Sequence, residues 1–148
     1  MYSEGNIIYF DPFYFKNGSA STRKYFLVLK NMGDSAILAS LPSSVIHLPS
    51  FVDIKHGCID IPESCISCYI FEQRKPITKC GWAFDLNTFL YGNWLDDYTL
   101  DILKETYQIE GVEYEIIGRL TDVELQNVKN CFKNSNVVKR RYRKLLSE

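Results

Sequence analysis

The strongest constraint on the fold is a pair of apolar runs that flank a tight turn. Tyr25–Leu29 is a continuous run of β-favouring residues, as expected of a strand that is buried on both faces. Met32-Gly33-Asp34 can reverse the chain, and Ser35–Leu41 then returns as the next strand. The sequence therefore predicts an antiparallel hairpin between residues 25 and 41.

Further strands and several helices are expected around this hairpin. Asn6–Phe10 is a short apolar run that Asp11-Pro12 ends as a turn. Thr121 and Glu124 have the spacing of a capping box, in which each side chain bonds the backbone N–H of the other residue. Several short strands at close spacing favour a small antiparallel barrel or sandwich with added helices, a mainly β (β+α) fold. The expected strands are 6–10, 25–29, 35–41, 51–54, 58–61, 66–72 and 113–119, and the expected helices are 85–91, 95–107, 121–133 and 135–146.

Length and composition fit a single domain over residues 1–148. The chain is 46% hydrophobic and 24% charged, which excludes extensive disorder. It has 10 Tyr, 9 Phe and 2 Trp, and this density of aromatic rings favours strands. No apolar run approaches the roughly 18 to 20 residues that span a bilayer, and the first residues lack a basic signal region. We therefore expect a cytoplasmic protein with no membrane partner.

The five cysteines agree with that expectation, because a secreted chain of this size more often carries an even set. Cys65-x-x-Cys68 raises a zinc hypothesis, with Cys58, Cys80 or His56 as further ligands. Positions three apart on a strand point to opposite faces, however, so small buried thiols are the favoured interpretation. His47 and His56 are expected to be solvated loop residues. The sequence has no dinucleotide, P-loop or zinc-protease motif, and we expect neither a metal nor a cofactor.

Charge is distributed unevenly along the chain. Residues 139–148 hold five bases and one acid, whereas the first 138 residues hold twelve bases and seventeen acids. No acid occurs between Asp11 and Asp34, a window that contains Lys16, Arg23 and Lys24. Any contact with nucleic acid is therefore expected near residues 16–30 and 74–79, away from the acidic segment 96–124.

Four segments also carry a family pattern. Gly5–Pro12 followed by Gly18–Leu29 gives a strand, a Gly-Ser loop, and an Arg just before an aliphatic strand. Ala36–Ser44 is a strand that ends in a Ser-bearing turn. Phe71–Thr78 contains Glu-Gln-Arg-Lys-Pro-Ile-Thr, and Ile117–Val128 contains Ile-Gly-Arg-Leu-Thr before a helix. In order and spacing, these segments resemble the MazF/PemK/Kid toxins.

The resemblance implies an SH3-like antiparallel β-barrel with C-terminal helices, usually a homodimer. It also implies the toxin of a type II toxin–antitoxin system, which a cognate antitoxin restrains. The implied activity is metal-independent endoribonuclease cleavage of single-stranded RNA, in which a ribose 2′-OH attacks the adjacent phosphate.

The resemblance also assigns candidate residues. Arg23 takes the place of an Arg that can fork two phosphate oxygens. Ser44 matches a residue of the catalytic turn, and Glu72 stands where some members have a proposed general base. The implied RNA-binding residues are Lys16, Ser19, Lys24, Ser43, Gln73, Arg74 and Lys75.

The chain departs from the family pattern at several places. Ala20 replaces a loop Glu, Lys24 replaces a Pro, and Ile70 replaces an Arg. Residues 85–112 form a partly helical insertion, and the helix at about 135–146 is additional. The first three departures touch the proposed acid–base residues, so the chain can also be a catalytically inactive RNA- or protein-binding barrel. A CcdB-like toxin that acts on a topoisomerase is the third hypothesis.

The candidate residues also have structural interpretations. Arg23 can be a surface base at the start of a strand, and Ser44 a simple turn residue. Glu72 can form an exposed cross-strand pair with Arg74 or Lys75. The basic segment Lys139–Lys144 is expected to be the solvated face of a terminal helix, with RNA binding as its alternative.

Overall fold

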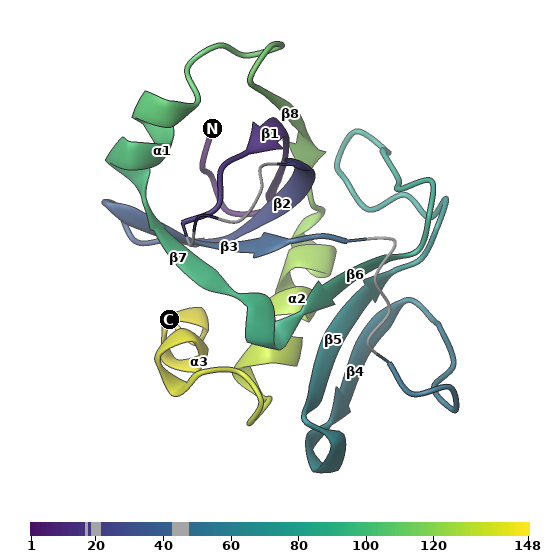
Figure 1. The fold of residues 1–148 in the computed structure, drawn as a ribbon. Helices are drawn as coiled ribbons and strands as arrows, with labels where there is room; N and C mark the ends of the chain where they lie inside the picture. The colour runs from purple at the N-terminus through teal and green to yellow at the C-terminus, as the bar shows by residue number, and fades with distance from the viewer. Residues whose placement is uncertain (17, 19–21, 43–47) are drawn as a thin grey trace.

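The computed structural model describes residues 1–16, 18, 22–42 and 48–148. In this part of the chain the strands form two antiparallel sheets, one in the order β7-β3-β2-β1-β8 and one in the order β4-β5-β6 (Figure 1). The two sheets do not join into a closed barrel within the described ranges. The strands are β1 (Asn6–Phe13), β2 (Thr22–Asn31), β3 (Ser35–Ser40), β4 (Gly57–Ile61), β5 (Ile66–Phe71), β6 (Thr88–Tyr91), β7 (Asp96–Thr99) and β8 (Tyr114–Arg119). The helices are α1 (Leu100–Thr106), α2 (Asp122–Lys133) and α3 (Arg140–Leu146), with short 3-10 turns at Pro62–Ser64 and Gly92–Trp94.

The expected hairpin is confirmed. β2 and β3 pair antiparallel, with Phe26 opposite Ser40 and Leu27 opposite Ala39. Side chains alternate between the faces of a strand, and both faces of β2 are covered. Leu27 belongs to one buried cluster and Val28 to another. This explains why the apolar run is continuous rather than alternating.

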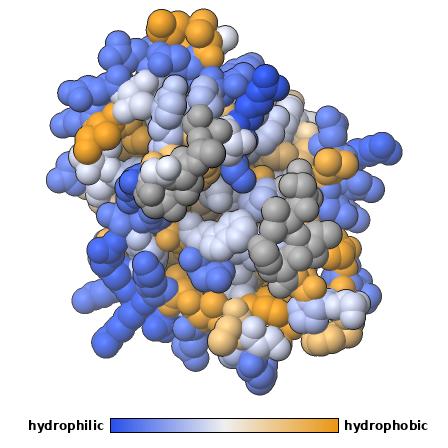
Figure 2. Space-filling model, in the orientation of Figure 1, coloured by the Kyte–Doolittle hydropathy of each residue, from blue (hydrophilic) through white to orange (hydrophobic). Residues whose placement is uncertain are grey.

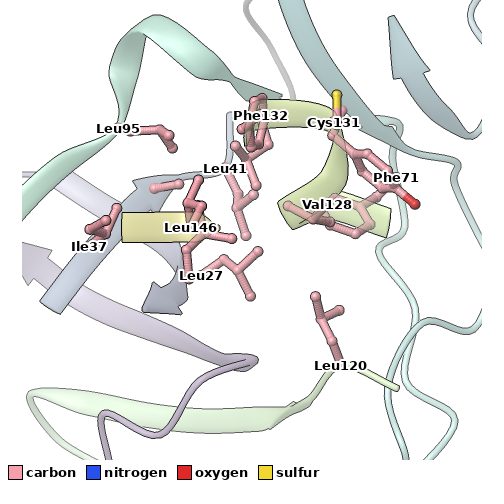
Figure 3. Close-up of a cluster of buried hydrophobic side chains, with 14 of the residues drawn as sticks. Leu27, Ile37, Leu41, Phe71, Leu95, Leu120, Val128, Cys131, Phe132 and Leu146 are labelled. Carbon is pink, nitrogen blue, oxygen red and sulfur yellow. The ribbon is translucent and has the colours of Figure 1, made fainter. Parts of the chain in front are cut away.

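The larger core lies between the five-stranded sheet, the three-stranded sheet and the C-terminal helices (Figure 3). Leu27 and Ile37 supply its floor from β2 and β3, and Phe71 supplies one wall from β5. Phe132 of α2 and Leu146 of α3 close it. Because residues from both sheets and both helices share this core, the chain folds as one hydrophobic unit in the described part.

A second core covers the other face of the large sheet. Phe26 and Val28 of β2 pack there with Leu100 and Leu103 of α1. Figure 1 shows α1 on the opposite side of the large sheet from α2 and α3. The two faces of β2 are therefore separated by the sheet, except beside its edge strand β7, where Lys24 of β2 and Lys139 just before α3 line one pocket.

The prediction of a helix at 85–91 is wrong. Thr88–Tyr91 forms β6, which pairs with β5 and is buried at all four positions. The expected helix at 95–107 is also shorter, because Asp96–Thr99 forms β7 against β3 and α1 begins only at Leu100. A short apolar run does not by itself distinguish strand from helix, and pairing with a distant strand decides it here.

Two further boundaries differ from expectation. β1 continues through Asp11-Pro12 to Phe13, and its register against β2 shifts between Phe10 and Phe13. Such an irregularity accommodates a residue without a backbone N–H. Residues 51–54 contain no strand.

The C-terminal helices follow the sequence more closely. Thr121 caps α2, and its hydroxyl accepts a hydrogen bond from the Glu124 N–H at 3.2 Å. The last helix begins at Arg140 rather than near Ser135. The Ser135 hydroxyl donates to Asp60 Oδ1 at 2.7 Å and accepts from the Val137 N–H at 3.2 Å, and such local bonds compete with helix formation.

Candidate nucleic-acid interface

Arg23 lies at the start of β2 with its side chain 74% exposed. Its Nε is 3.2 Å from Asp11 Oδ1 of the neighbouring strand β1. This single contact fixes the side chain while both terminal guanidinium nitrogens have no hydrogen bond to any described residue. Asp11 therefore pairs with the Nε side of the exposed Arg23 guanidinium, and the two terminal nitrogens can still donate hydrogen bonds to an anion.

A row of aromatic rings occupies the same face of β2 as Arg23. Tyr9 of β1 and Tyr25 of β2 are directly opposite in register, with ring centroids 4.8 Å apart. Trp82 lies 5.9 Å from Tyr25, and Phe84 lies 5.4 Å from it. Tyr9, Tyr25 and Trp82 are half-buried, so part of each ring remains open to solvent.

The sequence did not indicate this row, because its members come from three separate segments. Alternating residues on β1 and β2 place Tyr9 and Tyr25 side by side, and the loop before β6 folds back over them. The backbone N–H of Arg74 donates to the Phe84 carbonyl at 2.7 Å, which holds that loop closed.

Lys24 lies on the other face of β2 from Arg23, with Phe26. Lys16 also lies away from the aromatic row, where its ammonium is 3.1 Å from Asp96 Oδ2 and 4.3 Å from the centroid of the Tyr98 ring. The structure thus divides the basic window between two faces. Arg23 lies on the same face of the sheet as Tyr25. Lys16 and Lys24 lie on the opposite face, beside Asp96 and Tyr98 of β7.

The segment that contains Glu72, Gln73, Arg74 and Lys75 is an exposed turn after β5. The Glu72 N–H donates to His56 Nδ1 at 3.1 Å, and the Gln73 N–H donates to Asn87 Oδ1 at 2.8 Å. Among the described residues, no ion pair joins Glu72 to Arg74 or Lys75, and no hydrogen bond joins it to Arg23. Ser19, Ser43 and Ser44, together with Ala20 and His47, lie outside the described residues.

His56 is not the solvated loop residue that the sequence indicated. Its side chain is 11% exposed, and its Nε2 lies 2.5 Å from Glu124 Oε1. The same carboxylate oxygen accepts a hydrogen bond from the Tyr69 hydroxyl at 2.6 Å. Because Nδ1 accepts the Glu72 N–H, the imidazole must donate from Nε2 to Glu124.

Burial raises the pKa of the Tyr69 hydroxyl, and its hydrogen bond to Glu124 raises it further. Tyr69 therefore stays a donor at neutral pH. Glu124 is the residue expected to bond back to Thr121. Instead the Thr121 N–H donates to the Ile77 carbonyl at 3.0 Å, so only half of the capping box forms.

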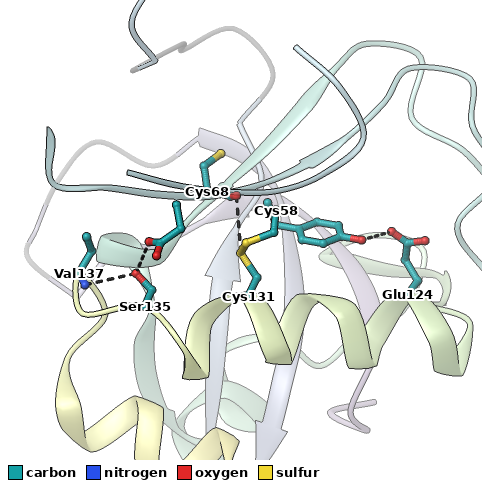
Figure 4. Close-up of a disulfide and its surroundings, with 8 residues drawn as sticks. Cys58, Cys68, Glu124, Cys131, Ser135 and Val137 are labelled. Carbon is teal, nitrogen blue, oxygen red and sulfur yellow. Dashed lines mark hydrogen bonds between the residues drawn. A yellow bond between two sulfur atoms is a disulfide. The ribbon is translucent and has the colours of Figure 1, made fainter. Parts of the chain in front are cut away.

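The expectation of small buried thiols is wrong for four of the five cysteines. Cys58 of β4 and Cys131 of α2 form a disulfide beside the Tyr69–Glu124 hydrogen bond (Figure 4). Cys65 and Cys80 are exposed, and only Cys68 is a buried thiol. Burial raises the pKa of Cys68 to about 12, so that thiol is inert at neutral pH.

The disulfide borders a groove of about 450 Å³ between β4 and α2. Its lining combines His56, Asp60 and Tyr69 with three asparagines of α2, Asn127, Asn130 and Asn134. The described residues that line this groove include no lysine or arginine. It therefore lacks the positive charge that a phosphate site requires.

The comparisons with known proteins add no family. No protein-family model matches this chain, and no curated protein matches it. Within the described ranges, no group of three His, Cys, Asp or Glu residues is placed to hold a metal ion. No helix of that same part is long and apolar enough to cross a membrane.

Proposed function

We propose that this chain is a metal-independent endoribonuclease of the MazF/PemK type, the toxin of a type II toxin–antitoxin pair. The observation that carries the proposal is the position of Arg23, exposed at the start of β2 beside the ring row Tyr9–Tyr25–Trp82. Proteins bind single-stranded nucleic acid by combining cations for the backbone with aromatic rings for the bases. The Arg23 face has both components.

The chemistry needs a base, an acid and charge stabilisation. The ribose 2′-oxygen attacks phosphorus, its proton passes to the base, and the bond to the 5′-oxygen breaks as the acid protonates that oxygen. The products are a 2′,3′-cyclic phosphate and a 5′-hydroxyl. In this proposal Arg23 stabilises the phosphorane through its terminal nitrogens, while Asp11 orients it through Nε.

Glu72 is the proposed base, Ser44 the proposed phosphate contact, and Gln73, Arg74 and Lys75 the proposed RNA contacts. The proposal treats the two sheets as an opened form of an SH3-like barrel. A homodimer, a cognate antitoxin and a cytoplasmic location belong to the same proposal. Their support is the ordered sequence resemblance.

A second candidate function is RNA binding without cleavage. It is favoured by the position of Glu72, whose backbone is held at His56 and which has no bond to Arg23 in the described chain. A general base must reach the proton that it abstracts. If Glu72 stays at His56, the Arg23 face can bind RNA but cannot activate its 2′-hydroxyl.

The deciding experiment is cleavage of a mixed single-stranded RNA pool in EDTA by the wild type and by Arg23→Ala. We expect Arg23→Ala to lower the rate about a hundredfold or more, because it removes transition-state charge stabilisation of about 3 to 4 kcal/mol. Arg23→Lys should recover only part of the rate, since an ammonium cannot fork two oxygens. Lys104→Ala, an exposed base on α1, is the matched control.

Equal cleavage by wild type and Arg23→Ala contradicts a catalytic role for Arg23. If the wild type cuts no RNA but binds it with a marked salt dependence, the second candidate is favoured. Thermal unfolding of each variant controls for folding. An exposed charge of this kind contributes less than about 0.5 kcal/mol to stability.

A further inference from the structure

We infer that the opposite face of β2 carries a nucleotide-binding pocket, which takes a planar base and its phosphate. The pocket has a volume of about 430 Å³, within the roughly 300 to 1,000 Å³ of small-molecule sites. Its wall joins Lys24 and Phe26 of β2 to Trp94 and Tyr98 around β7, and to Lys139 just before α3. This site is separate from Arg23 and does not depend on cleavage.

The first argument is charge. Lys24 is half-buried, Lys139 is exposed, and neither has a carboxylate within ion-pair distance among the described residues. The ammonium of Lys139 lies 5.8 Å from the centroid of the Tyr142 ring. Both lysines line the pocket, so it presents two cations that no described acid neutralises.

Asp96 is the one acid among the described lining residues, and its charge is paired with that of Lys16. Its Oδ2 lies 3.1 Å from the Lys16 ammonium, and its Oδ1 accepts the Asp97 N–H at 2.9 Å. The neighbouring Asp97 pairs with Arg141 and accepts the Tyr142 hydroxyl at 2.7 Å. The pocket therefore keeps a net positive charge, which suits a phosphate.

The second argument is the aromatic lining. Trp94 is 39% exposed, and its ring lies 4.9 Å from the ring of Tyr91, which supports it from inside. Phe15 and Tyr98 add partly open rings, and Phe26 gives a buried floor. Open rings beside cations match a nucleotide better than a bare anion, because the base can stack while the phosphate is paired.

The third argument is the surface around the pocket. Arg140, Arg143 and Lys144 follow Lys139 on α3, and Figure 2 shows hydrophilic surface gathered at the lower left, where Figure 1 places this helix. This basic segment had two interpretations from the sequence, a solvated face or an RNA contact. Through Lys139 its first residue reaches the pocket, and the remaining bases extend the positive surface beyond it.

The base and phosphate that bind in this pocket can belong to a free nucleotide or to one nucleotide of a single strand. Isothermal titration should therefore use the Arg23→Ala variant, so that the proposed RNA face contributes little, with a nucleoside 5′-monophosphate, a 2′-O-methyl oligonucleotide that cannot be cleaved, and inorganic phosphate. We expect the first two to bind and phosphate to bind at least tenfold more weakly. Tighter binding of the oligonucleotide identifies a strand as the source, and equal binding identifies a free nucleotide.

Lys24→Gln and Lys139→Gln should each weaken nucleotide binding about tenfold, and Trp94→Leu should do the same. Lys104→Gln removes the same charge from the exposed surface of α1, outside the pocket lining, and should change the affinity less than twofold. Circular dichroism checks the fold of Trp94→Leu, and the lysine variants give the test even if that variant unfolds.

Three results overturn the inference. They are the absence of nucleotide binding at millimolar concentration, phosphate binding as tight as nucleotide binding, and equal affinities for Lys24→Gln and Lys104→Gln. None of these depends on RNA cleavage, so failure of the pocket and failure of the endoribonuclease proposal are distinguishable.

Discussion

Arg23 and Lys24 are consecutive basic residues, yet they lie in opposite electrostatic environments. Arg23 faces Asp11, and the pKa of the neighbouring Tyr25 is raised by burial first, then by Tyr9, and then by the charges of Asp85 and Glu115. Lys24 faces a pocket in which Asp96, the only acid among the described lining residues, is already paired with Lys16. The comparison teaches that a count of bases in a sequence window does not locate an anion site. The alternation of a strand and the partners on each face decide it.

The disulfide provides the largest test of how separate the two faces are. Cys58 and Cys131 are 73 residues apart, and they tie β4 to α2 on the Arg23 side of the sheet. Replacing both by serine should lower the free energy of unfolding by about 4 kcal/mol, because the unfolded chain regains loop entropy. Nucleotide binding by the folded protein at low temperature should be unchanged.

Urea denaturation measures the free energy of unfolding of the double serine variant. Cys65→Ser, which removes an exposed free thiol, is the matched control. If the double variant loses nucleotide binding while it remains folded, the Lys24 face depends on the disulfide and the separation fails.

Gly92→Ala should destabilise the packing of the segment that carries Trp94. A Cβ at Gly92 would lie 2.8 Å from Val138 Cγ2 and 2.9 Å from Ser67 Oγ, just before the segment that carries Trp94. Overpacking of this kind costs about 1 to 3 kcal/mol. Thermal unfolding measures the loss, and Asn93→Ala at the exposed neighbour should cost less than about 0.5 kcal/mol. An unchanged melting temperature for Gly92→Ala would show that the close packing around Gly92 does not contribute to the stability of the fold.

A pH series tests how α3 is held beside the pocket. The hydrogen bond from Tyr142, followed by the charges of Arg141 and Lys16, lowers the pKa of Asp97 against the opposing effect of burial. Because folding lowers this pKa, the stabilisation is fully present above the ordinary Asp value of about 3.9 and is lost as the pH falls through the lower folded value.

Asp97→Asn should therefore be less stable than wild type at pH 7, and the difference should shrink below about pH 4. Asp101→Asn, on the exposed side of α1, is the control. A difference between wild type and Asp97→Asn that stays constant from pH 7 to pH 3 would contradict this account.

Asp11→Asn should give the smallest effect. Exposed ion pairs contribute about 0.2 to 1 kcal/mol, so freeing Arg23 should raise the affinity for single-stranded RNA by about twofold to fivefold at low salt. Binding of the mononucleotide on the Lys24 face should not change. If the mononucleotide affinity rises as much as the RNA affinity, the charge of Asp11 acts on both faces and the two sites are not electrostatically separate.

The parts of the fold that the sequence predicted are those with local signals. Tyr25–Leu29 and the turn after it form as expected, and so does the half of the capping box in which the Thr121 hydroxyl accepts the Glu124 N–H. β6 and β7 were missed because their partners β5 and β3 lie far along the chain, and neither segment is long enough to show a period.

The candidate site divides in the same way. Arg23 and Lys24 could be named as basic residues at a strand start, but their separation onto two faces needs the register of β2 with both neighbours. The hydrogen-bonded cluster of His56, Tyr69 and Glu124 could not be predicted from the sequence. Glu124 is 68 residues from His56 and 55 residues from Tyr69. Trp94 and Tyr98 lie four residues apart in the sequence, and this spacing gave no sign that both line one pocket with Lys24.

The measurement that tests the central claim most directly compares Arg23→Ala with Lys24→Ala in two assays on the same preparations. One assay is single-turnover RNA cleavage at saturating RNA, and the other is mononucleotide affinity. We predict that Arg23→Ala loses cleavage about a hundredfold and keeps its mononucleotide affinity, whereas Lys24→Ala loses mononucleotide affinity about tenfold. Equal losses by both variants in both assays would contradict the assignment of the two residues to separate sites.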